Sequence, residues 1–171
     1  MGRKNKRKRT EYPERLGFNP WKYIHSVPGT SAVSKSDWRG RSEHPQVPHR
    51  GDIWFADLNP HAGTSVQGGC RPVLIVSNDI GNAYAETLNV LPMTRHLKKP
   101  NLPCHTELDP DIVSDKRQTL DTSMILAEQI TTISKSELRN YVGSIKDEVL
   151  LSAVNRAIAG QLGLASIDRH N

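Results

Sequence analysis

The segment from Gly51 to Asn82 constrains the fold more than any other part of the chain. It joins a strand over residues 52–58, with apolar side chains on both faces, to a glycine-rich loop and an apolar strand over residues 72–77. The loop contains three glycines, which let the backbone bend close to a ligand because they lack a Cβ atom. Arg71 follows directly, so the sequence predicts a cation at a strand mouth, where it can meet a phosphate.

The rest of the chain adds short strands and two helices. Ser134 and Glu137 have capping-box spacing, which predicts a short helix that ends near Gly143. Apolar residues at three- and four-residue spacing predict a last helix over about residues 147–162. Short strands with segregated helices predict an α+β fold, mainly β, built on a curled antiparallel sheet. The other strands are predicted over residues 87–94, 105–109 and 123–130, with a turn over residues 78–82.

The positive charge lies almost entirely at the N-terminal end. Residues 1–50 carry twelve Lys and Arg against four Asp and Glu, whereas the remaining residues carry eleven against fourteen. Dense like charge resists packing, so we expect a basic, partly disordered extension over residues 1–49, a folded domain over residues 50–165 and a short tail over residues 166–171. No apolar run approaches the roughly 18 residues of a membrane helix, which predicts a cytoplasmic protein that does not enter a membrane.

The cysteines and histidines show no spacing typical of a cofactor or metal site. Cys70 and Cys104 form no CxxC motif and are expected to be reduced thiols. No HExxH motif or paired Cys/His spacing is present, so neither a metal nor another cofactor is expected. His105 lies on a predicted strand and is expected to be a structural residue, while Glu128 is expected to bind a backbone amide.

Seven segments carry a resemblance to a known family. They include GDIWFADLNP at 51–60, QGGCRPVLIV at 67–76, NDIGN at 78–82, VLPMT at 90–94 and SMILAEQI at 123–130. The other two are LPCHTEL at 102–108 and the last predicted helix up to Leu164. Taken in their order along the chain, these segments resemble the MazF/PemK family of endoribonucleases, the toxin half of bacterial toxin–antitoxin pairs. The resemblance covers about two-thirds of the chain.

The resemblance implies a fold, an activity and partners. The implied fold is an SH3-like curled antiparallel barrel with a C-terminal helix, as in MazF and CcdB toxins. The implied activity is sequence-specific cleavage of single-stranded RNA, notably mRNA, without a metal. The implied partners are a second copy in a homodimer and a cognate antitoxin whose tail lies across the RNA groove.

The resemblance also implies site residues. Arg71 takes the position of the family's catalytic arginine, and Thr94 takes that of its catalytic threonine. The family's loop also supplies a serine or glutamate near the scissile phosphate. Because this loop is one residue longer than the usual motif, Thr64 and Ser65 compete for that role, and Ser65 is favoured. The expected RNA-binding residues are Thr64, Gln67, Gly68, Gly69, Asn82, Arg95, Lys98 and Lys99.

The chemistry of such a site can be derived from the residue types. RNA can be cleaved by its own 2′-OH, which attacks the adjacent phosphorus, and DNA lacks this group. The protein must then help to remove that proton, stabilise the phosphorane and protonate the leaving 5′-oxygen. A guanidinium is almost always protonated, so the secure role of Arg71 is a bidentate clamp on the developing charge. The sequence leaves open whether Arg71 also transfers protons.

Other interpretations remain at this stage. Arg71 can also be read as a surface arginine paired with Asp79 or Glu107. The protein can be a CcdB-like toxin that poisons gyrase without nuclease activity, although such a toxin has no use for Arg71 together with Thr94. It can also be a nucleic-acid-binding module without catalysis, with the basic extension as its main contact.

Overall fold

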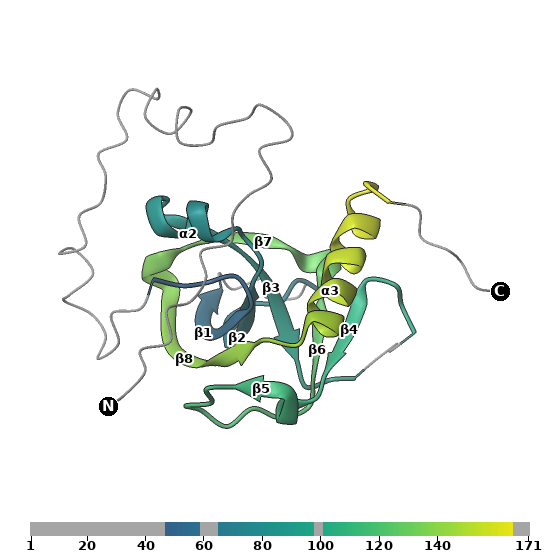
Figure 1. The fold of residues 1–171 in the computed structure, drawn as a ribbon, viewed down its shortest axis with the longest axis horizontal. Helices are drawn as coiled ribbons and strands as arrows, with labels where there is room; N and C mark the ends of the chain where they lie inside the picture. Colours follow the sequence, from purple (N-terminus) through teal and green to yellow (C-terminus); the bar gives the residue numbers. More distant parts are fainter. Residues whose placement is uncertain (1–46, 59–64, 98–100, 166–171) are drawn as a thin grey trace, which may run out of the picture. The chain divides into compact units, whose positions relative to one another are not determined.

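The computed structural model describes residues 47–58, 65–97 and 101–165 of the 171-residue chain (Figure 1). In this part of the chain, eight strands join into one sheet. The strands are β1 (Asp52–Leu58), β2 (Gly69–Ile75), β3 (Thr87–Thr94), β4 (His105–Leu108), β5 (Val113–Ser114), β6 (Ser123–Leu126), β7 (Thr131–Ser134) and β8 (Leu138–Ile145). The helices are α2 (Asp79–Tyr84) and α3 (Glu148–Gln161), with 3-10 turns η2 (Pro110–Ile112), η3 (Ala127–Gln129) and η4 (Lys135–Glu137).

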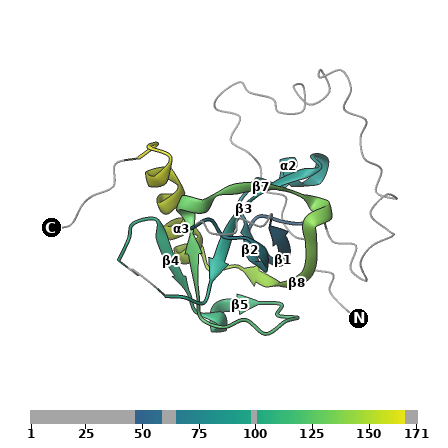
Figure 2. The same cartoon turned by 180° about the vertical axis from the view of Figure 1, so that it is seen from behind.

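All strand pairs in the sheet are antiparallel. The order is β4-β6-β3-β2-β1-β8-β5, and β7 pairs with β3 beside this path. Strand β3 is therefore shared, because its first half pairs with β7 and its last two residues pair with β6. Figure 1 labels β3 together with β7 and β6, and Figure 2 shows β3 beside β7 from behind. The predicted fold class, α+β and mainly β with an SH3-like curled sheet and a C-terminal helix, is confirmed.

The two faces of the sheet bury separate apolar clusters. Side chains alternate between the faces of a strand, so neighbouring residues belong to different clusters. One cluster includes Leu74, Leu91 and Met93, together with residues of α3. The other includes Val73, Val90 and the residues that pack around Trp54.

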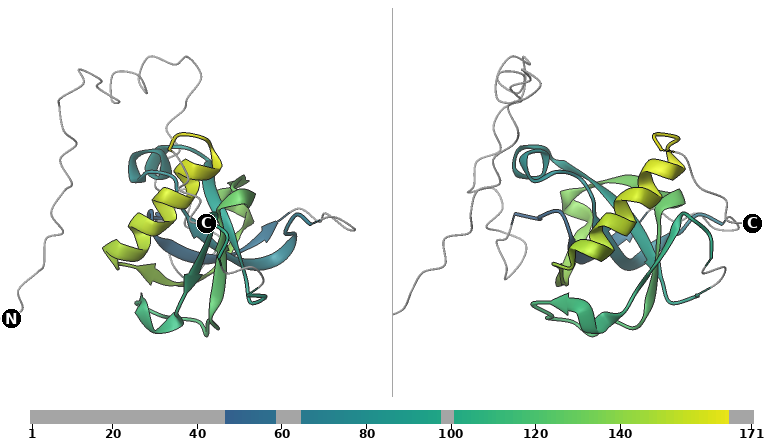
Figure 3. Two further views of the ribbon diagram at one scale, coloured as in Figure 1. Left: turned by 90° about the vertical axis from the view of Figure 1, so that its right-hand side faces the viewer. Right: turned by 45° about the vertical axis from the view of Figure 1, so that its right-hand side comes forward.

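Helix α3 covers the first of these faces. Its N-cap residue Asp147 accepts a hydrogen bond from the backbone N–H of Leu150 at 2.7 Å, as the predicted start requires. Val154 and Ala157 are buried in the cluster, and the helix contacts β4 and η3. Figure 3 shows α3 crossing the sheet on the side of β4. Among the described residues, no helix has both the length and the apolar character needed to span a membrane.

The predicted helix over residues 134–143 is wrong. The capping box forms, since Ser134 N–H donates to Glu137 at 2.6 Å, but it caps only the single turn η4. The chain then enters β8, which pairs with β1 and packs against both clusters. Gly143 lies inside this strand because β5 approaches closely there, and a Cβ atom would come within 2.5 Å of Val113 Cγ1.

Two smaller predictions also need correction. Residues 78–82 were expected to form a turn, but Asn78 caps the short helix α2 by accepting a hydrogen bond from Gly81 N–H at 2.8 Å. The strand predicted over residues 123–130 ends at Leu126, where η3 begins. This early end matters because it turns Glu128 and Gln129 out of the sheet ladder and toward other segments.

Candidate active site

Arg71 is the third residue of β2. The sequence predicted that the strand starts at residue 72, which would have placed Arg71 before it. The strand begins at Gly69, whose φ of +74° lies in the left-handed region that favours glycine. Arg71 then pairs with the buried Ala56 of β1, so its backbone belongs to the sheet. A rigid strand positions a side chain more accurately than a loop does.

The strand register brings Arg71 and Thr94 to the same end of the sheet. Strands β2 and β3 pair from Ile75 opposite Val90 to Val73 opposite Pro92. The printed pairing ends there, and Arg71 and Thr94 each lie two residues beyond this last pair, one on each strand. Opposite residues in an antiparallel pair point to the same face, so both side chains project from one face at one strand end. Both are half-buried.

The loop before β2 holds the Arg71 guanidinium in place. Its Nε donates to the carbonyl oxygen of Gly68 at 2.8 Å, and Nη2 donates to the same oxygen. Its Nη1 donates to the side-chain oxygen of Gln67. A guanidinium has five N–H groups, so these contacts leave two for a substrate within the described part of the molecule.

Thr94 and the residues after it form a polar rim. The hydroxyl oxygen of Thr94 accepts a hydrogen bond from His96 N–H at 3.2 Å, which leaves its own O–H to donate elsewhere. Arg95 is exposed and pairs with Asp121 at 3.2 Å. Exposed pairs of this kind are weak, so Arg95 can exchange Asp121 for a phosphate at small cost.

Gln129 anchors the loop and was not among the residues selected from the sequence. Its side-chain oxygen accepts a hydrogen bond from Gln67 N–H at 2.7 Å, and its amide donates to the carbonyl oxygen of Ser65 at 3.2 Å. It reaches the loop because β6 ends at Leu126 and η3 turns the following residues toward it. The sequence offered only one signal, a polar pair at the end of an apolar run.

A small pocket adjoins the Arg71 loop. Its volume is about 60 Å³, and Gln67 belongs both to its wall and to the group that contacts Arg71. The wall combines amide, hydroxyl and carboxyl groups with an apolar floor. It is formed by Leu58, Val66, Gln67, Pro92, Gln129, Thr131, Thr132, Ile133 and Glu137.

The remaining residues selected from the sequence divide into three groups. Ser65 is exposed at the start of the described loop, and Gly68 and Gly69 lie beside Arg71. Asn82 is fully buried in α2, where its amide donates to the carbonyl oxygen of Ser77 at 3.0 Å, so the expected contact with RNA is replaced by a structural role. The third group lies outside the described residues and comprises Thr64, Lys98 and Lys99.

Cys70 lies next to Arg71 but on the opposite face of β2. Burial raises the pKa of its thiol, and the neighbouring Asp57 carboxylate raises the pKa further. The thiol therefore stays protonated at neutral pH and is a poor nucleophile. Cys70 is therefore not selected as a reactive group of this strand end.

The chain is similar to proteins of one family along most of its length. The family model for PemK-like, MazF-like toxins of type II toxin–antitoxin systems matches residues 49–162. The chain belongs to this family. Endoribonuclease EndoA of Bacillus subtilis (strain 168) is 43% identical over 119 residues, which cover 70% of this chain and 96% of that protein. Endoribonuclease MazF of Staphylococcus saprophyticus is 40% identical over 121 residues, covering 71% of this chain and 96% of that protein.

Solved structures of family members share the fold. An endoribonuclease from a mycobacterial species, solved in complex with its cognate antitoxin, is 26% identical with a TM-score of 0.53, covering 70% of this chain and 99% of that one. A chain of a MazE–MazF crystal structure from Deinococcus radiodurans is 20% identical with a TM-score of 0.55. That match covers 70% of this chain and 100% of the Deinococcus chain, and it supports the PemK/MazF fold alone.

Proposed function

We propose that this chain is an endoribonuclease toxin that cleaves single-stranded RNA, including mRNA, through the 2′-OH of its substrate and without a metal. Its membership in the PemK-like, MazF-like family and its similarity to named endoribonucleases support the activity. The observation that carries the mechanism is the shared face and shared strand end of Arg71 and Thr94. One phosphodiester group can contact both side chains there.

Arg71 stabilises the charge that develops at the phosphorus. The 2′-oxygen forms a bond to phosphorus while the bond to the 5′-oxygen breaks, and the non-bridging oxygens gain negative charge in between. The two N–H groups of Arg71 that the loop leaves available meet these oxygens as a bidentate clamp. Because the loop already holds the guanidinium, little reorganisation is needed during the reaction.

Thr94 and the loop complete the site. The Thr94 hydroxyl donates to a non-bridging oxygen, and its own acceptor position is fixed by His96 N–H. Ser65 provides the further loop hydroxyl, in preference to Thr64. The RNA contacts are assigned to Gln67, Gly68 and Gly69 around the clamp and to Arg95, Lys98 and Lys99 beyond Thr94.

The assembly and location are part of the same proposal. A relative solved with its cognate antitoxin supports an antitoxin partner for this chain. A homodimer in the cytoplasm, with residues 50–165 as the catalytic domain and residues 1–49 as a basic extension that attracts RNA, completes it. The named relatives are endoribonucleases, so neither a gyrase poison nor a binding module without catalysis is favoured.

The decisive experiment compares Arg71→Ala with Arg156→Ala on a ladder of single-stranded RNA in EDTA. Arg156 is an exposed arginine of α3, so its loss controls for general charge. We expect discrete fragments from the native chain and from Arg156→Ala, and cleavage reduced by about 10²–10³-fold or more in Arg71→Ala.

A second substrate tests the nucleophile. An RNA with a single 2′-deoxy nucleotide at the mapped cleavage position should resist cleavage there, since it lacks the attacking group. Cleavage of that substrate, full activity of Arg71→Ala, or loss of all activity in EDTA would each overturn the mechanism.

A further inference from the structure

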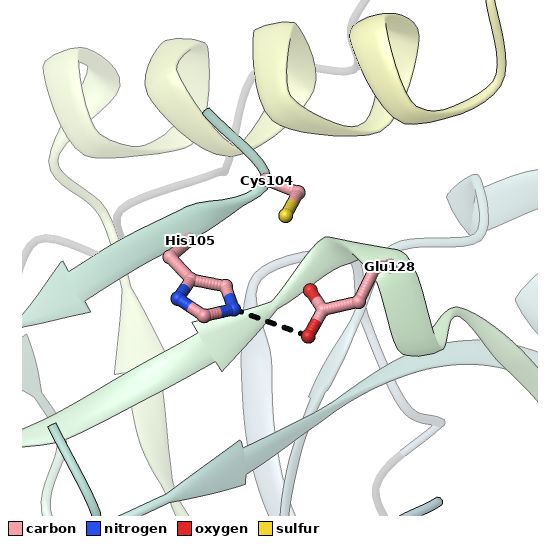
Figure 4. A group of neighbouring side chains, drawn as sticks. All are labelled: Cys104, His105 and Glu128. Carbon is pink, nitrogen blue, oxygen red and sulfur yellow. Dashed lines mark hydrogen bonds and ion pairs between the residues drawn. The ribbon is translucent and has the colours of Figure 1, made fainter. Parts of the chain in front are cut away.

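A second group of chemically active side chains lies where β4 begins. Cys104 and His105 are consecutive, and Glu128 reaches them from η3, 23 residues beyond His105. Figure 4 shows the sulfur, the imidazole and the carboxylate pointing toward one another beneath α3. One ligand atom from each residue lies within 4.8 Å of the other two.

The backbone holds this cluster together. The N–H of Ala127 donates to the carbonyl oxygen of Cys104 at 2.9 Å, which ties the start of η3 to the start of β4. His105 is paired in the sheet with Leu126, two residues before Glu128. His105 and Glu128 therefore start from regular elements, and Cys104 starts from the turn directly before β4, where its carbonyl group is held by Ala127. This is the arrangement that a preformed ligand site requires.

The ion pair between His105 and Glu128 uses only one of the two carboxylate oxygens of Glu128. His105 Nε2 and Glu128 Oε1 are 3.1 Å apart, and the His105 side chain is only 9% exposed. This agrees with the structural role expected for His105, and it gives Glu128 a histidine partner in place of the expected backbone amide. The second carboxylate oxygen, Oε2, is buried and has no hydrogen-bond partner of standard geometry within the described residues, while the Cys104 thiol lies near enough to interact with the carboxylate. Burying an acceptor without a full partner costs free energy, so a bound cation would remove that penalty.

We propose that Cys104, His105 and Glu128 bind a thiophilic divalent cation, with Zn²⁺ as the best match. Thiolate, imidazole and carboxylate are its usual ligands, at about 2.0–2.3 Å. Tetrahedral bonds of that length place ligand atoms about 3.4 Å apart, so side-chain movements of about 1 Å complete the site. Mg²⁺ and Ca²⁺ prefer oxygen ligands and are poor candidates. Binding releases the thiol proton, and water fills the fourth position.

This site is separate from the reaction at Arg71. Glu128 faces β4, whereas the adjacent Gln129 faces the loop that holds Arg71. The cation is therefore not a reactant in cleavage. Its ligand Glu128 is, however, the sequence neighbour of Gln129, which holds the Arg71 loop. Spacing along the sequence gave no sign of the site because its third ligand comes from a different segment.

The test uses Co²⁺ and Zn²⁺ with the full chain in a Cys70→Ser background. The chain has two cysteines, so Cys104 is then the only thiol. We expect one Co²⁺ per chain, with a thiolate-to-cobalt charge-transfer band that Zn²⁺ abolishes by displacement. Added Cys104→Ser should remove the band, and added Glu128→Gln should weaken Zn²⁺ binding by about tenfold or more, since even indirect partners of a metal contribute that much.

A thiol-labelling experiment keeps the test independent of variant folding. In the Cys70→Ser variant without further changes, Zn²⁺ should slow the reaction of Cys104 with a thiol reagent by about tenfold or more. The reaction slows because a thiolate bound to the metal is not available to the reagent. Unchanged labelling with Zn²⁺, a missing charge-transfer band, or equal Zn²⁺ affinity after loss of Cys104 in a folded variant would overturn the proposal. None of these readouts depends on RNA cleavage.

Discussion

The two faces of the β2–β3 pair are covered differently. On one face, Leu74 and Leu91 lie in the cluster that α3 closes, and both are fully buried. On the other face, Val73 is equally buried, but the face opens at the strand end where Arg71 and Thr94 project. Successive side chains of a strand point to opposite faces, so one pair of strands contributes to both faces. Changes on the closed face should therefore affect stability, and changes at the open end should affect cleavage.

The largest expected effect is on the closed face. Leu91→Ala removes a fully buried side chain and leaves a cavity, so the free energy of unfolding should fall by about 2–5 kcal/mol. Denaturant unfolding measures this loss. Val149→Ala is the matched control, because Val149 on α3 is 77% exposed and its truncation should change the free energy of unfolding by under about 0.5 kcal/mol. Similar losses in both variants would mean that α3 does not close this face.

The next effect belongs to the open end. Thr94→Val keeps the shape of the side chain but removes the hydroxyl, so cleavage should fall by about 10²-fold while the free energy of unfolding changes little. Thr87→Val changes an exposed residue at the other end of the same strand and should retain full cleavage. Rates are compared in single-turnover assays. A Thr94→Val variant with native rates would remove Thr94 from the chemistry.

A smaller effect on the cleavage rate is expected from Gln129, which contacts the loop around Arg71 and not Arg71 itself. Gln129→Ala removes both hydrogen bonds that hold Gln67 and Ser65, so Arg71 should be positioned less well and kcat should fall by about tenfold. Gln129→Glu keeps an acceptor for Gln67 N–H and should recover part of the loss. If KM rises with kcat unchanged, Gln129 contacts the substrate and does not position the loop.

The open end could be predicted because its determinants are local. A glycine loop before an arginine and the resemblance of VLPMT to a family motif led to the selection of Arg71 and Thr94, and strand alternation puts the two side chains on one face. Their catalytic roles stay predictions. The fold class was predictable for the same reason, since short apolar strands and the apolar spacing of the last helix are local signals.

The errors arise where distant segments decide the structure. A capping box is satisfied by one turn, so Ser134 and Glu137 could not reveal that the next residues pair with β1 as β8. Asn82 looked available for RNA, but the fold of α2 buries it. The contacts of Gln129 with the loop and of Glu128 with His105 depend on where β6 ends, which tertiary pairing sets.

The smallest expected effect lies at the same strand end as Arg71, on the opposite face. Asp57 pairs in register with Cys70 there, and Arg139 of β8 donates to the Asp57 carboxylate, with its Nε at 2.7 Å. Both partners are about half exposed, so solvent screens the attraction. Arg139→Ala should lower the free energy of unfolding by less than about 1 kcal/mol, and raising the salt concentration should shrink this difference because Debye screening weakens exposed pairs. Cleavage should stay native, because the pair faces away from Arg71. A large loss of cleavage in Arg139→Ala, measured beside Arg71→Ala, would show that the two faces are not independent at this end of the sheet.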